Sequence, residues 1–214
     1  MLIKAIFDTL YMVLASGFFA LILGMPLGIW LAVTRKGGLR ENLPLHYALA
    51  FIVNVGRSIP FAILIVAIFP FTRLIVGTSI GTTASIVPLT ITAAPFLARV
   101  IEDALKSVSQ GSIDAALVMR TSLGRIIWRV MIPEALPVIV EAITLTVVTL
   151  VGYSAMAGLV GGGGLGKIAI QYGYQRFDGK IMLITLLLLL ALVWLFQWIG
   201  NAISFSIRRK RGLL

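Results

Sequence analysis

Long apolar runs, nearly free of charged residues, recur five times along the 214-residue chain. An α-helix needs about 20 such residues to cross the hydrocarbon core of a bilayer, and each run is of that order once helix tilt is allowed for. The pattern therefore predicts an all-α membrane protein whose five transmembrane helices pack as one bundle. The expected spans are residues 10–33, 47–69, 83–99, 136–159 and 181–207.

Prolines fall inside the first three of these spans. A proline leaves backbone groups without a helical partner, and inside a bilayer those groups must be satisfied by neighbouring helices or by water. The pattern thus favours a packed bundle that lines a cavity over isolated helices. The prolines in question are Pro26, Pro60, Pro88 and Pro95.

The composition agrees with a bilayer protein and excludes several kinds of chemistry. Hydrophobic residues make up 59% of the chain and charged residues only 12%, about half the charged fraction of a soluble domain. With so few charges, lipid must cover most of the surface. There is no cysteine, hence no disulfide, thiolate metal site or cysteine nucleophile. The single histidine, His46, flanks a span and has no second metal ligand near it in the sequence, so we expect no metal site.

The positive charges fall in loops and at the chain end, which sets an orientation. The net charge is +10, but the cations fall in short loops between apolar runs and form no basic patch interleaved with aromatic residues, so we expect no nucleic-acid partner. Twelve Lys and Arg lie on one side of the predicted bundle: Arg35, Lys36, Arg40, Arg99, Lys106, Arg120, Arg125, Arg129, Arg208, Arg209, Lys210 and Arg211. Five lie on the other: Lys4, Arg73, Lys167, Arg176 and Lys180. The positive-inside bias predicts an extracytoplasmic segment 1–9 and a basic cytoplasmic tail 208–214.

The third loop, roughly 101–133, is the only predicted cytoplasmic segment large enough to present a folded surface. Its sequence predicts two short helices between the third and fourth spans. Ser112 is a candidate cap for the first helix, and Thr121 or Ser122 for the second, which is expected to stop before Pro133. Spacing alone leaves two interpretations open, a coupling surface or an ordinary loop that covers the end of the bundle.

The residues of this loop resemble a known family. Asp114-Ala115-Ala116, followed by Val130-Met131-Ile132-Pro133, is similar to the Glu-Ala-Ala loop of ATP-binding-cassette importer permeases. Arg120 stands where that family usually has a glycine. The resemblance implies short coupling helices that dock on a cytoplasmic ATPase. The residues it assigns to this coupling loop are Asp114, Ala115, Ala116, Arg120, Gly124 and Pro133.

Further segments in the same order resemble the permeases of methionine importers. They are Arg57–Phe61, Gly77–Gly81, Ile86–Thr90, Ala93–Phe96, Pro133–Pro137 and Leu150–Gly166. The resemblance implies a bacterial inner-membrane homodimer of permeases, joined to two ATPase subunits and supplied with D- or L-methionine by an extracytoplasmic binding lipoprotein. It also implies that this chain is not itself an enzyme.

The glycine-rich segment 161–166 superficially resembles a nucleotide-binding loop. Gly161, Gly163 and Gly166 fit G-x-G-x-x-G, but Ile168 stands where a phosphate loop needs a Ser or Thr hydroxyl for magnesium, and no strand precedes the glycines. A flexible or tightly packed turn is the better interpretation. We therefore expect no cofactor on this chain, with ATP and Mg²⁺ bound by the partner subunit.

Six residues are candidates for a translocation pathway: Arg57, Ser58, Pro60, Tyr153, Ser154 and Met156. A cation as deep as Arg57 must face protein or water, either as a pathway residue or as a partner of carbonyls freed near Pro60. Tyr153, Ser154 and Met156 could line a route for an apolar amino acid, although ordinary helix packing is the stronger interpretation for each of them taken singly. Glu141, near the start of the fourth span, has the same two interpretations.

The sequence disfavours two other function classes. A self-contained secondary carrier or channel is disfavoured by the odd number of spans, the lack of an internal repeat and the scarcity of acids within spans, where Glu141 is the nearest candidate for proton coupling. An intramembrane enzyme is disfavoured because neither a nucleophile paired with a base nor a metal cluster is visible. The sequence thus favours a permease subunit.

Overall fold

The computed structural model describes residues 1–210 and confirms the predicted fold class. Within these residues every regular element is a helix, and four helices are long and apolar enough to cross a membrane, or five if one bent pair counts as a span. The elements are α1 (Leu2–Thr34), α2 (Leu43–Ser58), α3 (Phe61–Ala67), α4 (Phe69–Val76), α5 (Thr82–Lys106), α6 (Gln110–Val118), α7 (Leu123–Ile126), η1 (Ile127–Met131), α8 (Ile132–Ala157), η2 (Gly158–Val160), α9 (Gly164–Ile168), η3 (Ala169–Tyr174) and α10 (Gly179–Lys210).

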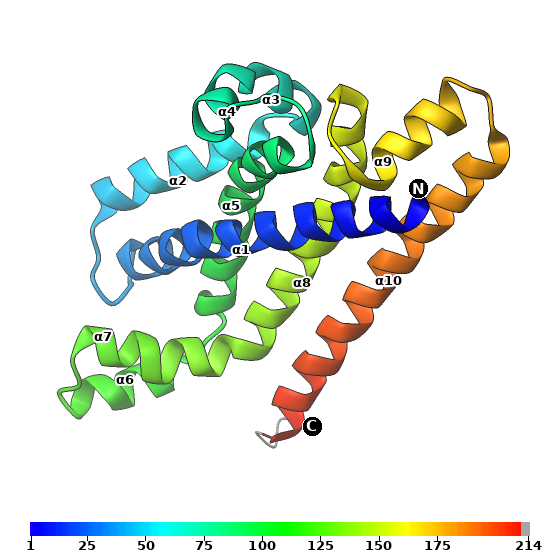
Figure 1. Ribbon diagram of the computed structural model, residues 1–214. Coiled ribbons are helices and arrows are strands. Elements are labelled where there is room, and N and C mark those ends of the chain that lie inside the picture. The colour runs from blue at the N-terminus through cyan, green and yellow to red at the C-terminus, as the bar shows by residue number, and fades with distance from the viewer. Residues whose placement is uncertain (211–214) are drawn as a thin grey trace.

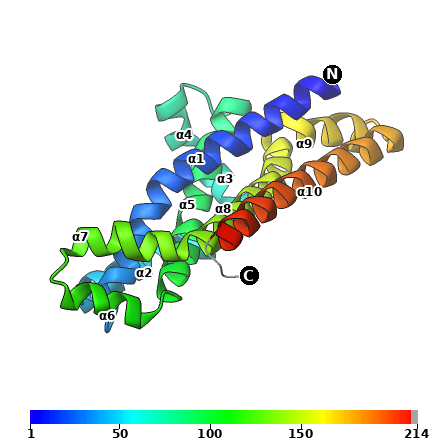
Figure 2. The ribbon, with the colours of Figure 1, turned by 90° about the horizontal axis from the view of Figure 1, so that it is seen from below.

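The two ends of the bundle carry different elements. Figures 1 and 2 both place α6 and α7 at one end of the molecule and α9 at the other. The first loop also lies at the α6 end, since Arg35, Gly37 and Leu39 share a small cavity with Gln110 and Leu117 of α6. The segment 1–9, predicted to precede the first span, is helical from Leu2 onward as part of α1. The last four residues of the predicted basic tail, 211–214, lie outside the described residues.

The predicted second span is a broken helix. Helix α2 ends at Ser58 and α3 begins at Phe61, and their axes differ by 99°. Proline disfavours the helical conformation of the residue before it, and Ile59 is accordingly extended, with φ −78° and ψ 122°. The continuous span predicted for residues 47–69 is therefore wrong at its outer end. By contrast, Pro26, Pro88 and Pro95 lie inside continuous helices.

The core contact is between α1 and α5, where two glycines remove the side chains between the helices. A Cβ atom built on Gly24 would lie 2.7 Å from the Ala94 carbonyl oxygen, and one on Gly28 would lie 2.6 Å from that of Ala98. Small residues four apart are a common way for membrane helices to approach closely. This contact fixes the rotation of α5, and so decides which of its residues face α2 and α8.

Helix α5 extends beyond the predicted end of the third span at residue 99. It continues to Lys106 because Glu102 pairs within the helix, with Arg99 Nη1 at 2.8 Å and Lys106 Nζ at 2.5 Å from its carboxylate oxygens. Residues three and four apart lie on one helix face, so these pairs keep a charged segment helical. The Glu102 side chain is fully buried. Glu102 was not among the residues predicted from the sequence to have a role.

The two short helices predicted in the third loop are present, with different ends. Helix α6 begins at Gln110, before the proposed cap Ser112, and the backbone N–H of Ser109 donates to Glu134 Oε1 across 3.3 Å. Ser122 does precede α7, as predicted. The predicted stop before Pro133 is wrong. The π-helical turn η1 leads directly into α8, and the wider turn accommodates the proline, which lacks an N–H, without ending the helix.

The glycine-rich segment forms the tightly packed turn that the sequence suggested. Gly161 adopts the left-handed conformation with φ +85°, and Gly158 and Gly166 pack so closely that neither position has space for a Cβ atom. The backbone N–H of Leu165 donates to Thr9 Oγ1 of α1 at 2.9 Å. These glycines thus serve close packing against the outer part of the bundle.

Candidate pathway and coupling surface

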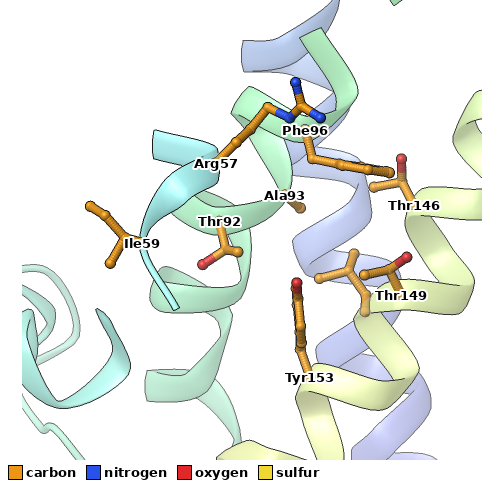
Figure 3. A pocket seen from close by; sticks show the side chains of 9 residues that line it. Arg57, Ile59, Thr92, Ala93, Phe96, Thr146, Thr149 and Tyr153 are labelled. Carbon is orange, nitrogen blue, oxygen red and sulfur yellow. The ribbon is translucent and has the colours of Figure 1, made fainter. Parts of the chain in front are cut away.

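A polar pocket of about 140 Å³ lies where α2, α5 and α8 meet. Figure 3 shows Arg57 extending from the end of α2 near Phe96 of α5, while the hydroxyl group of Tyr153 points toward the same space from α8. The pocket is lined by Arg57, Ile59, Thr92, Ala93, Phe96, Thr146, Thr149, Leu150 and Tyr153. The lining thus consists of one cation, four hydroxyl groups and several apolar side chains.

The structure brings only part of the predicted pathway together. Arg57 and Tyr153 line the pocket, while Pro60 forms the break between α2 and α3. Ser154 is buried and its hydroxyl donates to the Val151 carbonyl oxygen at 2.7 Å. Neither Ser58, whose hydroxyl donates to the Asn54 carbonyl oxygen, nor the exposed Met156 lines the pocket.

The Arg57 side chain has no ion pair or hydrogen bond with any residue from 1 to 210. It belongs to the last turn of α2, directly before the break, and its side chain is exposed. Placing an arginine deep in a spanning segment costs about 3 kcal/mol on insertion scales. No carboxylate of the described chain offsets this cost, because no Asp or Glu lines the pocket.

Three threonines supply acceptors on the wall that faces Arg57. Thr92 donates its hydroxyl proton to the Pro88 carbonyl oxygen at 3.0 Å, and Thr146 and Thr149 donate likewise to Ala142 and Leu145 at 2.8 Å. Each hydroxyl oxygen retains lone pairs after that donation. Tyr153 is held by its ring, which stacks on Phe61 with centroids 4.7 Å apart. The pocket wall is therefore fixed, and its hydroxyl oxygens can accept hydrogen bonds.

Sequence reasoning missed Thr92, Phe96, Thr146 and Thr149. Thr146, Thr149 and Tyr153 are spaced by three and four residues, which places them on one helix face, so the α8 half of the pocket had a usable signal. Thr92 and Phe96 on α5 have the same spacing. Which neighbouring helices these two residues face depends on how α5 packs against α1, and the sequence does not show that contact.

The predicted coupling loop divides into an exposed and a buried side. Ala115 is exposed, whereas Ala116 is 3% exposed and packs with Ile113 and Ile126 in the core. Asp114 is exposed and accepts a hydrogen bond from Gln110 Nε2 at 3.0 Å. The two alanines of the motif therefore have different roles, with Ala116 holding α6 on the bundle and Ala115 left on the surface.

Apolar side chains gather on the exposed side of this loop. Val118 is 84% exposed, Met119 73% and Trp128 65%. Large apolar side chains that cluster on an exposed surface mark sites of protein or membrane contact. This group, with Ala115 and Leu117, is called the loop surface below.

Arg120 occupies the residue position after the helix cap of α6, with a left-handed φ of 52°. The N–H of Thr121 donates to the Ala116 carbonyl oxygen and the N–H of Arg120 to that of Leu117, at 3.2 and 2.9 Å. These two bonds define a Schellman motif, whose left-handed residue is most often glycine. The backbone conformation thus explains why the importer permeases that this loop resembles usually have a glycine here. Arg120 adopts the same left-handed conformation although it carries a side chain.

The remaining predicted residues have simpler surroundings. Gly124 lies in α7 with no atom within 4 Å of a built Cβ, and Pro133 lies in the first turn of α8. His46 contacts the Leu31 carbonyl oxygen through Nδ1 at 3.2 Å, and no group of potential metal ligands occurs in residues 1–210. Glu141 accepts hydrogen bonds from Ser204 and Arg208 of α10. These contacts favour a structural role for Glu141 over a role in the pathway.

A helical bundle with a broken span, a polar pocket among its helices and a folded loop at one end defines a membrane permease. Residues 24–209 match the family described as binding-protein-dependent transport system inner membrane component, so the chain belongs to that family and is a component of the inner membrane.

Several known proteins are similar over most of the chain. The probable D-methionine transport system permease protein MetI of Vibrio cholerae is 55% identical over 203 residues, covering 95% of this chain and 90% of the relative. The D-methionine transport system permease protein MetI of Escherichia coli K12 is 50% identical over 158 residues, 74% and 73% of the two chains.

Two solved structures share the fold. An inward-facing structure of the MetNI methionine ABC transporter matches with a TM-score of 0.95 and 48% identity, covering 96% of this chain and 95% of that chain. An amino acid ABC transporter with histidines matches with a TM-score of 0.75 at 19% identity, covering 96% and 93% of the chains. The second likeness shows the fold alone.

Proposed function

We propose that this chain is the permease subunit of an ATP-driven methionine importer and forms its gated pathway. The observation that carries the proposal is the likeness to the MetNI methionine ABC transporter at a TM-score of 0.95 over 96% of the chain. The names of the curated relatives support D-methionine among the substrates. In this proposal, the pocket lined by Arg57 and Tyr153 is part of that pathway.

We infer that two copies of the chain pair and that each docks on one ATPase subunit through the loop surface. Exposed Val118, Met119 and Trp128 support docking, because they lie on the loop that resembles the coupling loop of importer permeases. ATP and Mg²⁺ are bound by the ATPase, and this chain carries no cofactor. An extracytoplasmic lipoprotein delivers the substrate.

The orientation follows from the ends of the bundle. The first loop, with Arg35, lies beside α6, and α7 contains Arg125. The C-terminal end of α10, with its three cations, lies on the same lower side of Figure 1 as α6 and α7. An excess of Lys and Arg marks the cytoplasmic side. The α6 end therefore faces the cytoplasm in this proposal, and α9 and the N-terminus face outward.

Uptake into proteoliposomes tests the function. The chain is reconstituted with its ATPase and binding lipoprotein, ATP is enclosed on the ATPase side, and accumulation of radiolabelled D- and L-methionine is followed. We expect uptake that requires ATP, the ATPase and the lipoprotein together, and no ATP hydrolysis by the permease alone. Accumulation without ATP or without the ATPase would contradict the proposal and favour a self-contained carrier.

A further inference from the structure

The pocket beside Arg57 contains a positive charge that nothing in the described chain neutralises. Its guanidinium group has no partner among residues 1–210, and no Asp or Glu lines the 140 Å³ pocket. The other polar groups of the lining are hydroxyls of threonines and of Tyr153. A neutral wall with one cation has an electrostatic preference for a negatively charged group.

We infer that this pocket is a binding site for the transported amino acid, in which Arg57 pairs with the substrate carboxylate. This inference rests on the proposed function, because it assigns a recognition step to the same pathway. Arginine presents its N–H donors as a planar fork that matches the two oxygens of a carboxylate. Because Arg57 belongs to the turn just before the break at Ile59, its side chain reaches the pocket from the end of a helix.

The rest of the pocket suits the other parts of an apolar amino acid. The O–H groups of Thr92, Thr146 and Thr149 donate to carbonyl oxygens of their own helices, and the hydroxyl oxygens keep lone pairs that can accept from an ammonium group. Phe96 and Leu150 provide apolar contact for a side chain. These neutral acceptors bind an ammonium group far more weakly than a carboxylate would, so the carboxylate is the group that this site requires.

A charge-based selectivity follows from the same residues. A ligand that keeps its carboxylate but lacks its ammonium group should still bind, whereas one whose carboxylate is an amide should not. Ligands with a cationic side chain should be excluded, because Arg57 would repel a second cation in the pocket. The affinity of this site for a ligand should thus depend mainly on whether the ligand has a carboxylate.

The test measures equilibrium binding to the permease–ATPase complex in nanodiscs without the binding lipoprotein, which otherwise imposes its own selectivity. The probes are L-methionine, 4-(methylsulfanyl)butanoate, which lacks the ammonium group, and L-methioninamide, which lacks the carboxylate. We expect the two carboxylates to bind saturably within about fivefold of each other, and methioninamide at least tenfold more weakly.

Variants of Arg57 test whether this residue causes the preference for a carboxylate. Arg57→Gln should remove the preference for a carboxylate and weaken methionine binding at least tenfold, and Arg57→Lys, which keeps the charge without the fork, should fall between. Arg73→Gln is the matched control, because Arg73 is an exposed arginine on α4 outside this pocket. The ATPase activity of each complex shows that the variants assemble.

Several results would overturn the inference. Equal binding of methioninamide and methionine to the wild-type complex, no saturable binding of methionine, or unchanged selectivity in Arg57→Gln would each do so. Failure of the proposed function is a different observation, namely the absence of ATP-dependent methionine uptake by the complete wild-type system. Normal uptake combined with carboxylate-independent binding would reject the site and leave the function intact.

Discussion

Arg208 of α10 is paired with Glu141 of α8, with 2.6 Å between Arg208 Nη2 and Glu141 Oε1. The same carboxylate oxygen accepts a hydrogen bond from Ser204 at 2.8 Å, so one acid joins two positions of α10 to α8. Both charged side chains are partly exposed, so the pair lies at the edge of the bundle. Because it joins α8 to α10, it is called the clamp below.

Removing this clamp should loosen α10 slightly. Arg208→Gln is expected to cost about 0.5–1 kcal/mol, because a partly exposed pair is screened by solvent. For a protein of this size that is a fall of about 1–4 °C in Tm. Arg209→Gln is the control, since Arg209 forms no ion pair within residues 1–210. Equal Tm values for the two variants in detergent would show that the pair contributes nothing.

The buried Glu102 should matter much more. Glu102→Gln removes the negative charge between Arg99 and Lys106 and leaves two cations facing each other at the end of α5. Breaking a buried ion pair from one side costs about 3–5 kcal/mol, and we expect the lower end because the cations are partly exposed. Asp103→Asn, whose side chain is 58% exposed, should stay within about 0.5 kcal/mol. Thermal unfolding of both variants decides this.

The glycine contact between α1 and α5 predicts a position-specific effect of one methyl group. In Gly28→Ala the new methyl group would lie 2.6 Å from the Ala98 carbonyl oxygen and should destabilise the bundle by about 1–3 kcal/mol. Gly17→Ala in the same helix meets its nearest atoms at an ordinary 3.7 Å and should be neutral. Comparable losses at the two positions, measured as Tm, would argue against close packing as the cause.

The two alanines of the coupling loop should respond differently to the same substitution. Ala115→Arg places a charge on the loop surface and should weaken binding to the ATPase at least tenfold while Tm stays unchanged. Ala116→Arg forces the charge into the core beside Ile113 and Ile126, so Tm itself should fall. A pull-down with purified ATPase, together with Tm, separates the two. Unaltered ATPase binding in Ala115→Arg would show that the loop surface is not the docking site.

The left-handed residue after α6 predicts a stabilising substitution. Arg120→Gly removes the steric cost of a Cβ in that conformation, about 1 kcal/mol. We expect a rise in Tm of the isolated permease. If Arg120 also contacts an acidic group of the ATPase, the same variant should bind that subunit less tightly, and the two measurements are independent. A lower Tm would contradict the assignment of a Schellman motif.

Much of the fold was predictable because span length and charge placement are properties of the local sequence. The break after α2 was not, since Pro60 does not differ by type from Pro26, Pro88 or Pro95, which remain inside helices. The end of the third span was misplaced for a related reason. The charge at Arg99 suggested the end of the span, although its pairing with Glu102 along the helix face keeps this segment helical.

The candidate site was predictable only in part. Arg57 is conspicuous as a lone cation in an apolar run, and Tyr153 lies in a segment that the resemblance had marked. Thr92 gave no such signal, because a threonine in a membrane helix can satisfy itself on its own backbone, as its bond to the Pro88 carbonyl oxygen shows. Its place in the pocket depends on how α5 rotates against Gly24 and Gly28, which is a tertiary property.

The continuous helix from Leu123 to Val160 has a mechanical consequence. The wider turn at residues 127–131 joins α7 to α8 without a break, so this 38-residue rod carries both Trp128 of the loop surface and the α8 wall of the Arg57 pocket. At about 1.5 Å per residue, Trp128 and Tyr153 are roughly 38 Å apart along it, and a tilt of about 10° around the loop end would displace Tyr153 by about 7 Å. In the proposed importer the rod would thus act as a lever, and a small rotation imposed at its loop end would change the pocket width on the scale of an amino acid.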